Sequence, residues 1–342
     1  MIVGFEAALE SLLCGRDLSA SGSKNLFRAL FQGDLDPVRA RAVVLLMARK
    51  GESGAELLGC VTALRELEPP FDSGLRGLID TCGTGGDGQR TANLSTLAAI
   101  VAAGAGARVA KHGNRAVTSA VGSSDLMEAL GVRLEVSRAR MVRAIREGGL
   151  GYFHAPSFHP VFARVQPLRR QLKVRTIFNL LGPLVNPLRL QGQTVGVSRE
   201  PLLEKFASVL AARGIRRAVI FRSQDGLDEL SPFARARCVW IENGKVRRST
   251  LDPRRYGFGS GSPAGLSGGS VQKNRAMALA LLGGKLQGPV RDAVLLNAAA
   301  AVWAAGRAET LDEGLEKSRR SILNGDALKA LQTLVRISRT GS

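Results

Sequence analysis

The chain has 342 residues, which is enough to bury a large core and to form two domains, or one domain with a lobe. Its 48 Lys and Arg residues against 29 Asp and Glu give a formal charge of +19, which would attract nucleic acid, anionic membranes or polyanionic small molecules. The basic residues are scattered and aromatic residues make up only 5%, so a dedicated nucleic-acid fold is not indicated.

The cysteines, the apolar runs and the N-terminus argue against a zinc-binding, disulfide-rich, membrane-spanning or secreted protein. The four cysteines lie far apart without a CxxC pair, which argues against a zinc site or a disulfide framework. The most apolar runs, residues 97–107 and 293–305, are too short to span a bilayer. The N-terminus carries Glu6 and Glu10 among its apolar residues, unlike a signal peptide. We therefore expect a cytoplasmic protein with reduced cysteines and no membrane partner.

The first 70 residues predict a small helical lobe. Four short segments show helical spacing of apolar residues, and glycines end the first three of them. The third begins at Asp36-Pro37, a cap followed by proline at the first helical position, and Ser53 with Glu56 resembles a capping box for the fourth. Because the lobe is apolar on more than one side, we expect it to form a homodimer surface.

Residues 71–342 predict an α/β domain with a mostly parallel central sheet flanked by helices. Strands are expected at 78–82, 151–154, 194–197 and 217–221, alternating with helices. Asn243-Gly244 predicts a hairpin near the end of this series, and helices are expected at 275–283 and 292–305. The segment 158–187 interrupts the alternation.

A glycine-rich loop follows the first predicted strand. Residues 83–88 read Gly-Thr-Gly-Gly-Asp-Gly, and four glycines in six residues let the backbone approach a ligand and form an anion-binding nest. Asn93, Ser95 and Thr96 fall where the next helix should start, so they can cap it or donate to a phosphate. Considered without the other motifs, this glycine loop could equally be an ordinary turn before a helix. The loop is not a Walker loop, and Asp87 fits a dinucleotide fingerprint poorly.

A second polar loop is predicted at residues 111–115, Lys-His-Gly-Asn-Arg, before a helix near Ser123. Lys111 and Arg115 would add full charge beside the glycine loop. Two neighbouring anion-binding turns imply a substrate with more than one phosphate group. His112, between these cations, is expected to be mostly neutral at pH 7.

An adjacent acidic pair, Asp228-Glu229, follows the predicted strand at 217–221 and a flexible loop. An isolated pair of this kind is usually a solvated acidic turn. Beside two phosphate loops it is better explained as a magnesium anchor, because Mg²⁺ prefers a few protein oxygens together with substrate phosphate.

These motifs, in this order and spacing, closely resemble the anthranilate phosphoribosyltransferase family, and the resemblance covers nearly the whole chain. It implies transfer of a phosphoribosyl group from phosphoribosyl pyrophosphate to the amino group of anthranilate in tryptophan biosynthesis, with magnesium, in a homodimer. It also implies that part of 160–190 joins the helical lobe. The positions matching the family's donor-binding and catalytic motifs are Gly83, Gly86, Asp87, Thr91, Asn93, Leu94, Ser95, Thr96, Lys111, His112, Gly113, Asn114, Arg115, Ala116, Val117, Thr118, Ser119 and Ser123.

The resemblance also implies an acceptor site and a metal site. Gly83, Asn114, His159 and Arg169 match the anthranilate contacts, and Ser95 with the acidic pair Asp228 and Glu229 matches the magnesium ligands. Without the resemblance, Arg169 would be interpreted as an exposed helix charge, the usual fate of arginine. The resemblance implies instead that its guanidinium binds a carboxylate through two hydrogen bonds.

The chain departs from the family at two places. His154 stands where the family usually has phenylalanine, so a buried imidazole there would need a hydrogen-bond partner. Val161-Phe162 replaces the commoner Ala-Met. Both changes concern the acceptor pocket. Two alternatives stay open: a pyrimidine nucleoside phosphorylase-like enzyme, and a non-catalytic relative that binds nucleic acid, although no sequence-specific nucleic-acid partner is expected.

Overall fold

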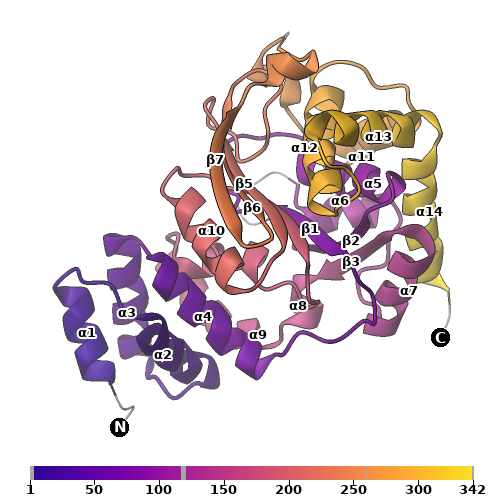
Figure 1. The fold of residues 1–342 in the computed structure, drawn as a ribbon. Coiled ribbons are helices and arrows are strands. Elements are labelled where there is room, and N and C mark those ends of the chain that lie inside the picture. Colours follow the sequence, from indigo (N-terminus) through magenta and orange to yellow (C-terminus); the bar gives the residue numbers. More distant parts are fainter. Residues whose placement is uncertain (1–3, 117–120, 260, 341–342) are drawn as a thin grey trace.

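The computed structural model describes residues 4–116, 121–259 and 261–340, which form a helical lobe and a larger α/β domain (Figure 1). The chain begins with four helices at the lower left of Figure 1: α1 (Phe5–Leu13), α2 (Ala20–Gln32), α3 (Pro37–Lys50) and α4 (Gly54–Leu67). The predicted caps are confirmed: Asp36 accepts the amides of Val38 and Arg39, and Ser53 forms a capping box with Glu56.

The α/β domain is built on one seven-stranded sheet in the order β3-β2-β1-β4-β5-β6-β7. The first five strands in chain order run parallel, and β6 and β7 extend the sheet antiparallel through a hairpin that turns at Asn243-Gly244. The mostly parallel sheet and the N-terminal helical lobe confirm the predicted fold class. The strands are β1 (Leu78–Gly83), β2 (Arg108–Gly113), β3 (Leu150–His154), β4 (Gly192–Gly196), β5 (Arg217–Ser223), β6 (Ala236–Glu242) and β7 (Lys245–Leu251).

Helices cover the sheet and join it to the lobe. The alanine-rich helix α12 is almost wholly buried and packs against α5, α13 and the central strands, because its small side chains allow close approach. Helix α10 contacts both the sheet and α4. The helices of this domain are α5 (Leu94–Gly104), α6 (Ser123–Ala129), α7 (Arg138–Gly148), α8 (Ala155–Phe158), α9 (Val161–Leu172), α10 (Leu202–Ala212), α11 (Val271–Leu282), α12 (Pro289–Ala304), α13 (Leu311–Leu323) and α14 (Asp326–Arg339).

The connection between β3 and β4 returns to the helical lobe. Helix α9 packs against α2 and α3, and the short 3-10 turn Ile177–Asn179 also contacts α3. Side chains from this connection therefore lie between the lobe and the carboxyl ends of the strands.

One predicted loop is a strand. Residues 111–113 belong to β2 and pair with β3 through Gly113↔His154, so the loop begins only at Asn114. The sequence misled because Lys111 and His112 are polar, yet both are buried and find backbone partners within the fold.

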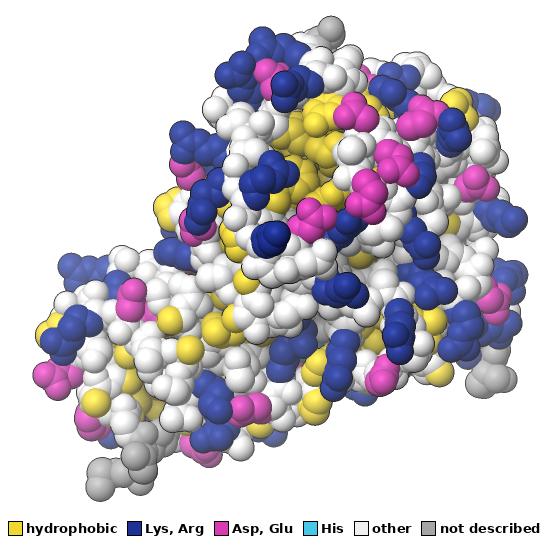
Figure 2. Space-filling view, viewed as in Figure 1, with side chains coloured by type: hydrophobic (Ala, Val, Ile, Leu, Met, Phe, Trp, Pro, Cys, Tyr) yellow, Lys and Arg dark blue, Asp and Glu magenta, His cyan; other side chains and the backbone are white. Residues whose placement is uncertain are grey.

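The sequence also predicted reduced cysteines, no membrane-spanning segment and scattered basic residues. All four cysteines are free. Among the described residues, no helix has the length and apolar character needed to cross a membrane. Figure 2 shows Lys and Arg side chains spread over this face of the molecule rather than gathered in one patch.

Candidate active site

The loops with the candidate residues meet at the carboxyl ends of β1, β2, β4 and β5. Strand order reverses between β1 and β4, since the chain continues to β2 and β3 on one side and to β5 on the other. In open parallel sheets the crevice at such a reversal is the usual place for a ligand. The two predicted anion loops follow the neighbouring strands β1 and β2.

The glycine loop after β1 takes a conformation that requires glycine. Gly85, Gly86 and Gly88 have φ values of 61°, 78° and 77°, in the left-handed region. The Arg175 guanidinium covers the loop, donating to the carbonyls of Thr84 at 3.1 Å and Gly85 at 2.8 Å. Any side chain at Gly86 would clash with Arg175.

The acidic pair lies directly against this loop. Asp228 Oδ2 accepts the Gly85 amide at 2.8 Å, and Glu229 Oε1 accepts the amide of Ser95 at 3.2 Å. The pair therefore joins the glycine loop to the first turn of α5. Both side chains are more than 90% shielded from solvent, so neither is the solvated turn that an isolated pair would form.

Burial raises the pKa of both carboxyl groups. For Asp228, burial and then the nearby Asp87 carboxylate raise the pKa to about 7. For Glu229, burial and then Asp228 raise the pKa, while Lys111 acts in the opposite direction. The two buried carboxyl groups, with the half-buried Asp87 beside them, thus share a site in which Arg175 favours the charged form of Asp228 and Lys111 that of Glu229.

The loop that carries the acidic pair is fixed from two sides. Ser223, the last residue of β5, donates its hydroxyl to the Glu229 carbonyl at 2.7 Å and accepts the Ser231 amide at 2.9 Å. Asn297 of α12 bonds the amide and the carbonyl of Leu230 at 3.0 and 2.9 Å. The carboxylates are therefore held by a rigid backbone.

This donor set fits a magnesium ion that is shared with a substrate. Among the described residues, no group of three or more His, Cys, Asp or Glu side chains is arranged to hold a metal alone. Two buried carboxyl groups with raised pKa values and the partly exposed Ser95 beside them provide hard oxygen atoms, and a bound cation would favour the charged form of both carboxyl groups. Mg²⁺ commonly completes such a partial set with water and phosphate oxygens.

The two cations expected on the second loop are less available than the sequence suggested. Lys111 lies on β2, is 3% exposed, and donates to the Thr81 carbonyl beneath the site. Arg115 is half-exposed, and its guanidinium pairs with Asp125 at 3.0 Å and Glu128 at 2.9 Å. Lys111 thus contributes charge from below, and Arg115 fixes the start of the loop to α6.

The first turn of α5 and its surroundings contain the other donor-site candidates. Asn93 is the N-cap residue, but its side chain donates to the Val121 carbonyl and accepts from Asn274 instead of capping the helix. Leu94 and Thr96 are buried on α5, and Thr91 forms a bridge with Ser267.

The second loop is described only in part. Asn114 and Ala116 precede α6, with the Ala116 amide donating to Asp125. Ser123 begins α6, where its hydroxyl accepts the Asn114 amide at 3.2 Å and meets the Tyr152 hydroxyl at 2.9 Å. Three further candidates lie outside the described residues: Val117, Thr118 and Ser119.

Two buried histidines, one of them the acceptor-site candidate His159, lie edge to face. The rings of His112 and His159 are 5.1 Å apart at an angle of 80°. Burial, and then His159, lower the pKa of His112 to about 3, so it is neutral as expected; burial, not its neighbouring cations, is the main cause. Arg169 lies on α9, is partly buried, and its guanidinium has no hydrogen-bond partner among the described residues.

Both departures in the acceptor region are accommodated. His154 has the partner that its burial requires, because its Nδ1 lies 2.8 Å from the Ser124 hydroxyl. Phe162 stacks edge to face on His159 at 5.8 Å and on Phe31 of the lobe at 6.4 Å. Val161 donates its amide to Glu68 at 2.7 Å.

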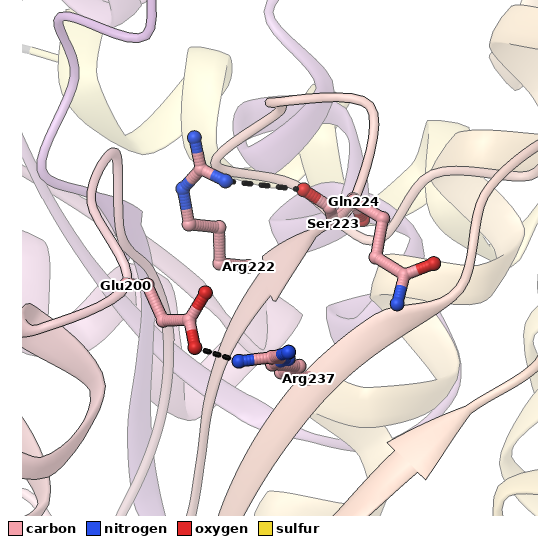
Figure 3. A pocket seen from close by; sticks show the side chains of 5 residues that line it. All are labelled: Glu200, Arg222, Ser223, Gln224 and Arg237. Carbon is pink, nitrogen blue, oxygen red and sulfur yellow. Dashed lines mark hydrogen bonds and ion pairs between the residues drawn. The ribbon is translucent and has the colours of Figure 1, made fainter.

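A small polar cavity of about 150 Å³ lies where β5 ends and the acidic loop begins (Figure 3). Arg237 pairs with Glu200 across it, and Arg222 donates to the carbonyls of Ser198 and Ser223. Its charged side chains are therefore engaged within the protein, and they support the end of the strand.

The helical lobe and the α/β domain match two family models. Residues 6–67 match the helical bundle domain of a glycosyl transferase family, and residues 75–328 match the a/b domain of that family. The chain thus belongs to a class of glycosyl transferases with a helical bundle and an α/β domain. Comparison with individual relatives identifies the family within this class.

An anthranilate phosphoribosyltransferase of Herpetosiphon aurantiacus is 42% identical over 325 residues, covering 94% of this chain and 95% of the relative. One from Thermomicrobium roseum is 42% identical over 332 residues, covering 96% and 95%. The crystal structure of the Thermus thermophilus enzyme is 39% identical with a TM-score of 0.91, covering 97% of this chain and 99% of that one. The chain belongs to the anthranilate phosphoribosyltransferase family.

Sequence reasoning missed four residues that build this site. Arg175 covers the glycine loop, Asn297 and Ser223 fix the acidic loop, and Glu68 contacts His159. Only Arg175 carried a signal, as one of several arginines in the segment that interrupts the alternation. Asn297 and Glu68 bond partners that are distant in sequence, and Ser223 is one of many serines whose hydroxyl partner no local pattern marks.

Proposed function

We propose that this protein transfers the 5-phosphoribosyl group from phosphoribosyl pyrophosphate to the amino group of anthranilate, giving N-(5-phosphoribosyl)anthranilate and pyrophosphate. The observation that carries the proposal is the contact of Asp228 and Glu229 with both the glycine loop and α5. A diphosphate bound there would meet loop amides, a helix N-terminus and a metal-binding pair at once.

The chain's own residues bind and position the two substrates. The glycine loop and the start of α5 would hold the phosphates of the donor, and Lys111 supplies positive charge from beneath. Asp228, Glu229 and Ser95 would hold Mg²⁺, which would neutralise charge on the leaving pyrophosphate. Arg169 would grip the anthranilate carboxylate in two-point contact.

No strong base is needed at this site. An aromatic amine is neutral at pH 7, and the neutral, buried His112 is a weak base. We therefore assign the rate acceleration to positioning and to charge stabilisation around the donor. The ribosyl carbon would pass through an oxocarbenium-like state with inversion.

Two further features belong to the proposal. The helical lobe exposes Leu13, Val38 and Leu45 on α1 and α3, and this apolar surface suits a homodimer contact. Magnesium dependence rests on the carboxylate pair. A yeast anthranilate phosphoribosyltransferase with the same fold has been solved in complex with phosphoribosyl pyrophosphate and Mg, at 24% identity and a TM-score of 0.89.

The direct test is an assay of anthranilate consumption by the purified protein with phosphoribosyl pyrophosphate and Mg²⁺. The double variant Asp228→Asn, Glu229→Gln should remain folded and lose magnesium-dependent turnover. Wild-type turnover in the double variant would refute the metal assignment. Phosphorolysis of a pyrimidine nucleoside instead would favour the phosphorylase alternative. Salt-resistant, sequence-specific DNA binding without phosphoribosyl transfer would favour a non-catalytic relative.

A further inference from the structure

Glu68 ends helix α4 of the lobe and binds two groups of the α/β domain. Its Oε2 lies 2.9 Å from His159 Nδ1, and its Oε1 accepts the Val161 amide at 2.7 Å. The side chain is 13% exposed, so water competes little for either oxygen. Glu68 therefore fixes both the His159 ring and the first residue of α9.

This contact determines which nitrogen of His159 carries a proton. An ionised carboxylate only accepts hydrogen bonds, so the nitrogen facing Glu68 must donate. A neutral His159 then has its proton on Nδ1, which leaves Nε2 with a lone pair. That Nε2 is buried and has no hydrogen-bond partner among the described residues.

His112 is held in the same tautomer by a different acceptor. Its Nδ1 lies 3.1 Å from the Gly182 carbonyl, which can only accept, and the ring is neutral. Its Nε2 is also buried without a partner among the described residues. When both rings are neutral, the two adjacent imidazoles thus present acceptor nitrogens, and two acceptors cannot bond each other.

We infer that Glu68 is a positioning residue that prevents His159 from bonding to His112. Without the carboxylate, the proton of His159 can move to Nε2, and this Nε2–H can then donate to His112 Nε2. Neither Nε2 atom would then be free to accept a hydrogen bond from a substrate. With Glu68 present, the pair is complementary to a group that carries two N–H donors. A primary aromatic amine is such a group, and its nitrogen lone pair would remain free to attack. The amine's identity as anthranilate rests on the proposed function.

The test is the variant Glu68→Met, which keeps the side-chain length and removes both acceptor oxygens. We expect the KM for anthranilate to rise on the order of tenfold, as for the loss of the amine's hydrogen bonds to two neutral imidazoles, with the KM for phosphoribosyl pyrophosphate unchanged. The chain has only three histidines, so ¹⁵N NMR of the ring nitrogens can assign each tautomer. We expect His159 to change from the Nδ1–H form to the Nε2–H form in the variant.

Glu66→Met is the matched control. Glu66 lies on the same helix, is 41% exposed and pairs with Lys24 at 3.0 Å, so Glu66→Met removes the same charge from a side chain that binds no histidine. If Glu68→Met does not fold, Glu68→Gln replaces it, because one amide oxygen cannot serve both His159 and Val161. An unchanged tautomer, or an anthranilate KM no higher than in the control, would overturn the inference. The NMR comparison needs no substrate, so it decides this point even if the wild-type protein fails to transfer phosphoribosyl groups.

Discussion

The shielded carboxylates should weaken the metal-free fold in a way that depends on pH. Asp228 has a pKa of about 7 in the folded protein against 3.8 ordinarily, a rise of about three pKa units caused first by burial. At about 1.4 kcal/mol for each unit, its ionisation costs up to about 4 kcal/mol of folding free energy. We therefore expect Asp228→Asn to stabilise the metal-free protein, because the amide oxygen can still accept the Gly85 amide.

The sign of the pH dependence follows from proton binding. Between about pH 4 and pH 7 the folded protein keeps the Asp228 proton and the unfolded chain has lost it, so stability falls as the pH rises. The asparagine side chain of the variant cannot titrate. The gain from Asp228→Asn should thus be near zero at pH 4 and reach its full size by pH 8.

Urea unfolding with a chelator present, at a series of pH values, measures this gain. Asp34→Asn serves as the control, since Asp34 is exposed on the lobe. Adding Mg²⁺ with pyrophosphate should stabilise the wild type more than Asp228→Asn. A gain that is equal at pH 5 and pH 8, or a loss of stability at pH 8, would show that Asp228 is not held in a site that penalises its charge.

Three further substitutions test the rest of the site. Arg169→Ala should raise the KM for anthranilate roughly ten- to a hundredfold and leave the donor KM unchanged; steady-state kinetics with each substrate varied would show it, and a loss confined to the donor would make Arg169 a phosphate ligand. Gly86→Ala should raise the KM for phosphoribosyl pyrophosphate, since a β-carbon at φ 78° would displace Arg175 from the glycine loop; an unchanged donor KM would contradict this. His154→Phe should change the free energy of unfolding by about 1 kcal/mol or less and leave kcat unchanged, because Ser124 keeps its bond to Tyr152; a large fall in kcat would instead place His154 in the acceptor site.

The sequence predicted those parts of the structure that depend on neighbouring residues. Asp36-Pro37, Ser53 with Glu56 and Asn243-Gly244 act through residues within a few positions, and each forms the predicted cap or turn. The glycine loop was predictable for the same reason, because its positive φ angles are a property of the glycines themselves.

The remaining features depend on contacts between distant segments. Lys111 and His112 resemble loop residues until pairing with β3 buries them. The free charge expected of Arg115 is neutralised by carboxylates on the next helix. The bond between Glu68 and His159 joins residues of different domains, and no local pattern marks it.

The acidic loop is held by strands that are close in sequence, whereas the glycine loop follows a strand whose partner is distant in sequence. Ser223 pairs with Ala236, and Gln224 donates to Arg235, so both ends of the acidic loop belong to one antiparallel hairpin. The strand before the glycine loop pairs with a distant one, through Ile79↔Gly192. Contacts between close residues cost less chain entropy and form sooner. During folding, the hairpin that carries Asp228 and Glu229 should therefore assemble before the parallel sheet that brings the glycine loop to it, so the two halves of the candidate site would form at different times.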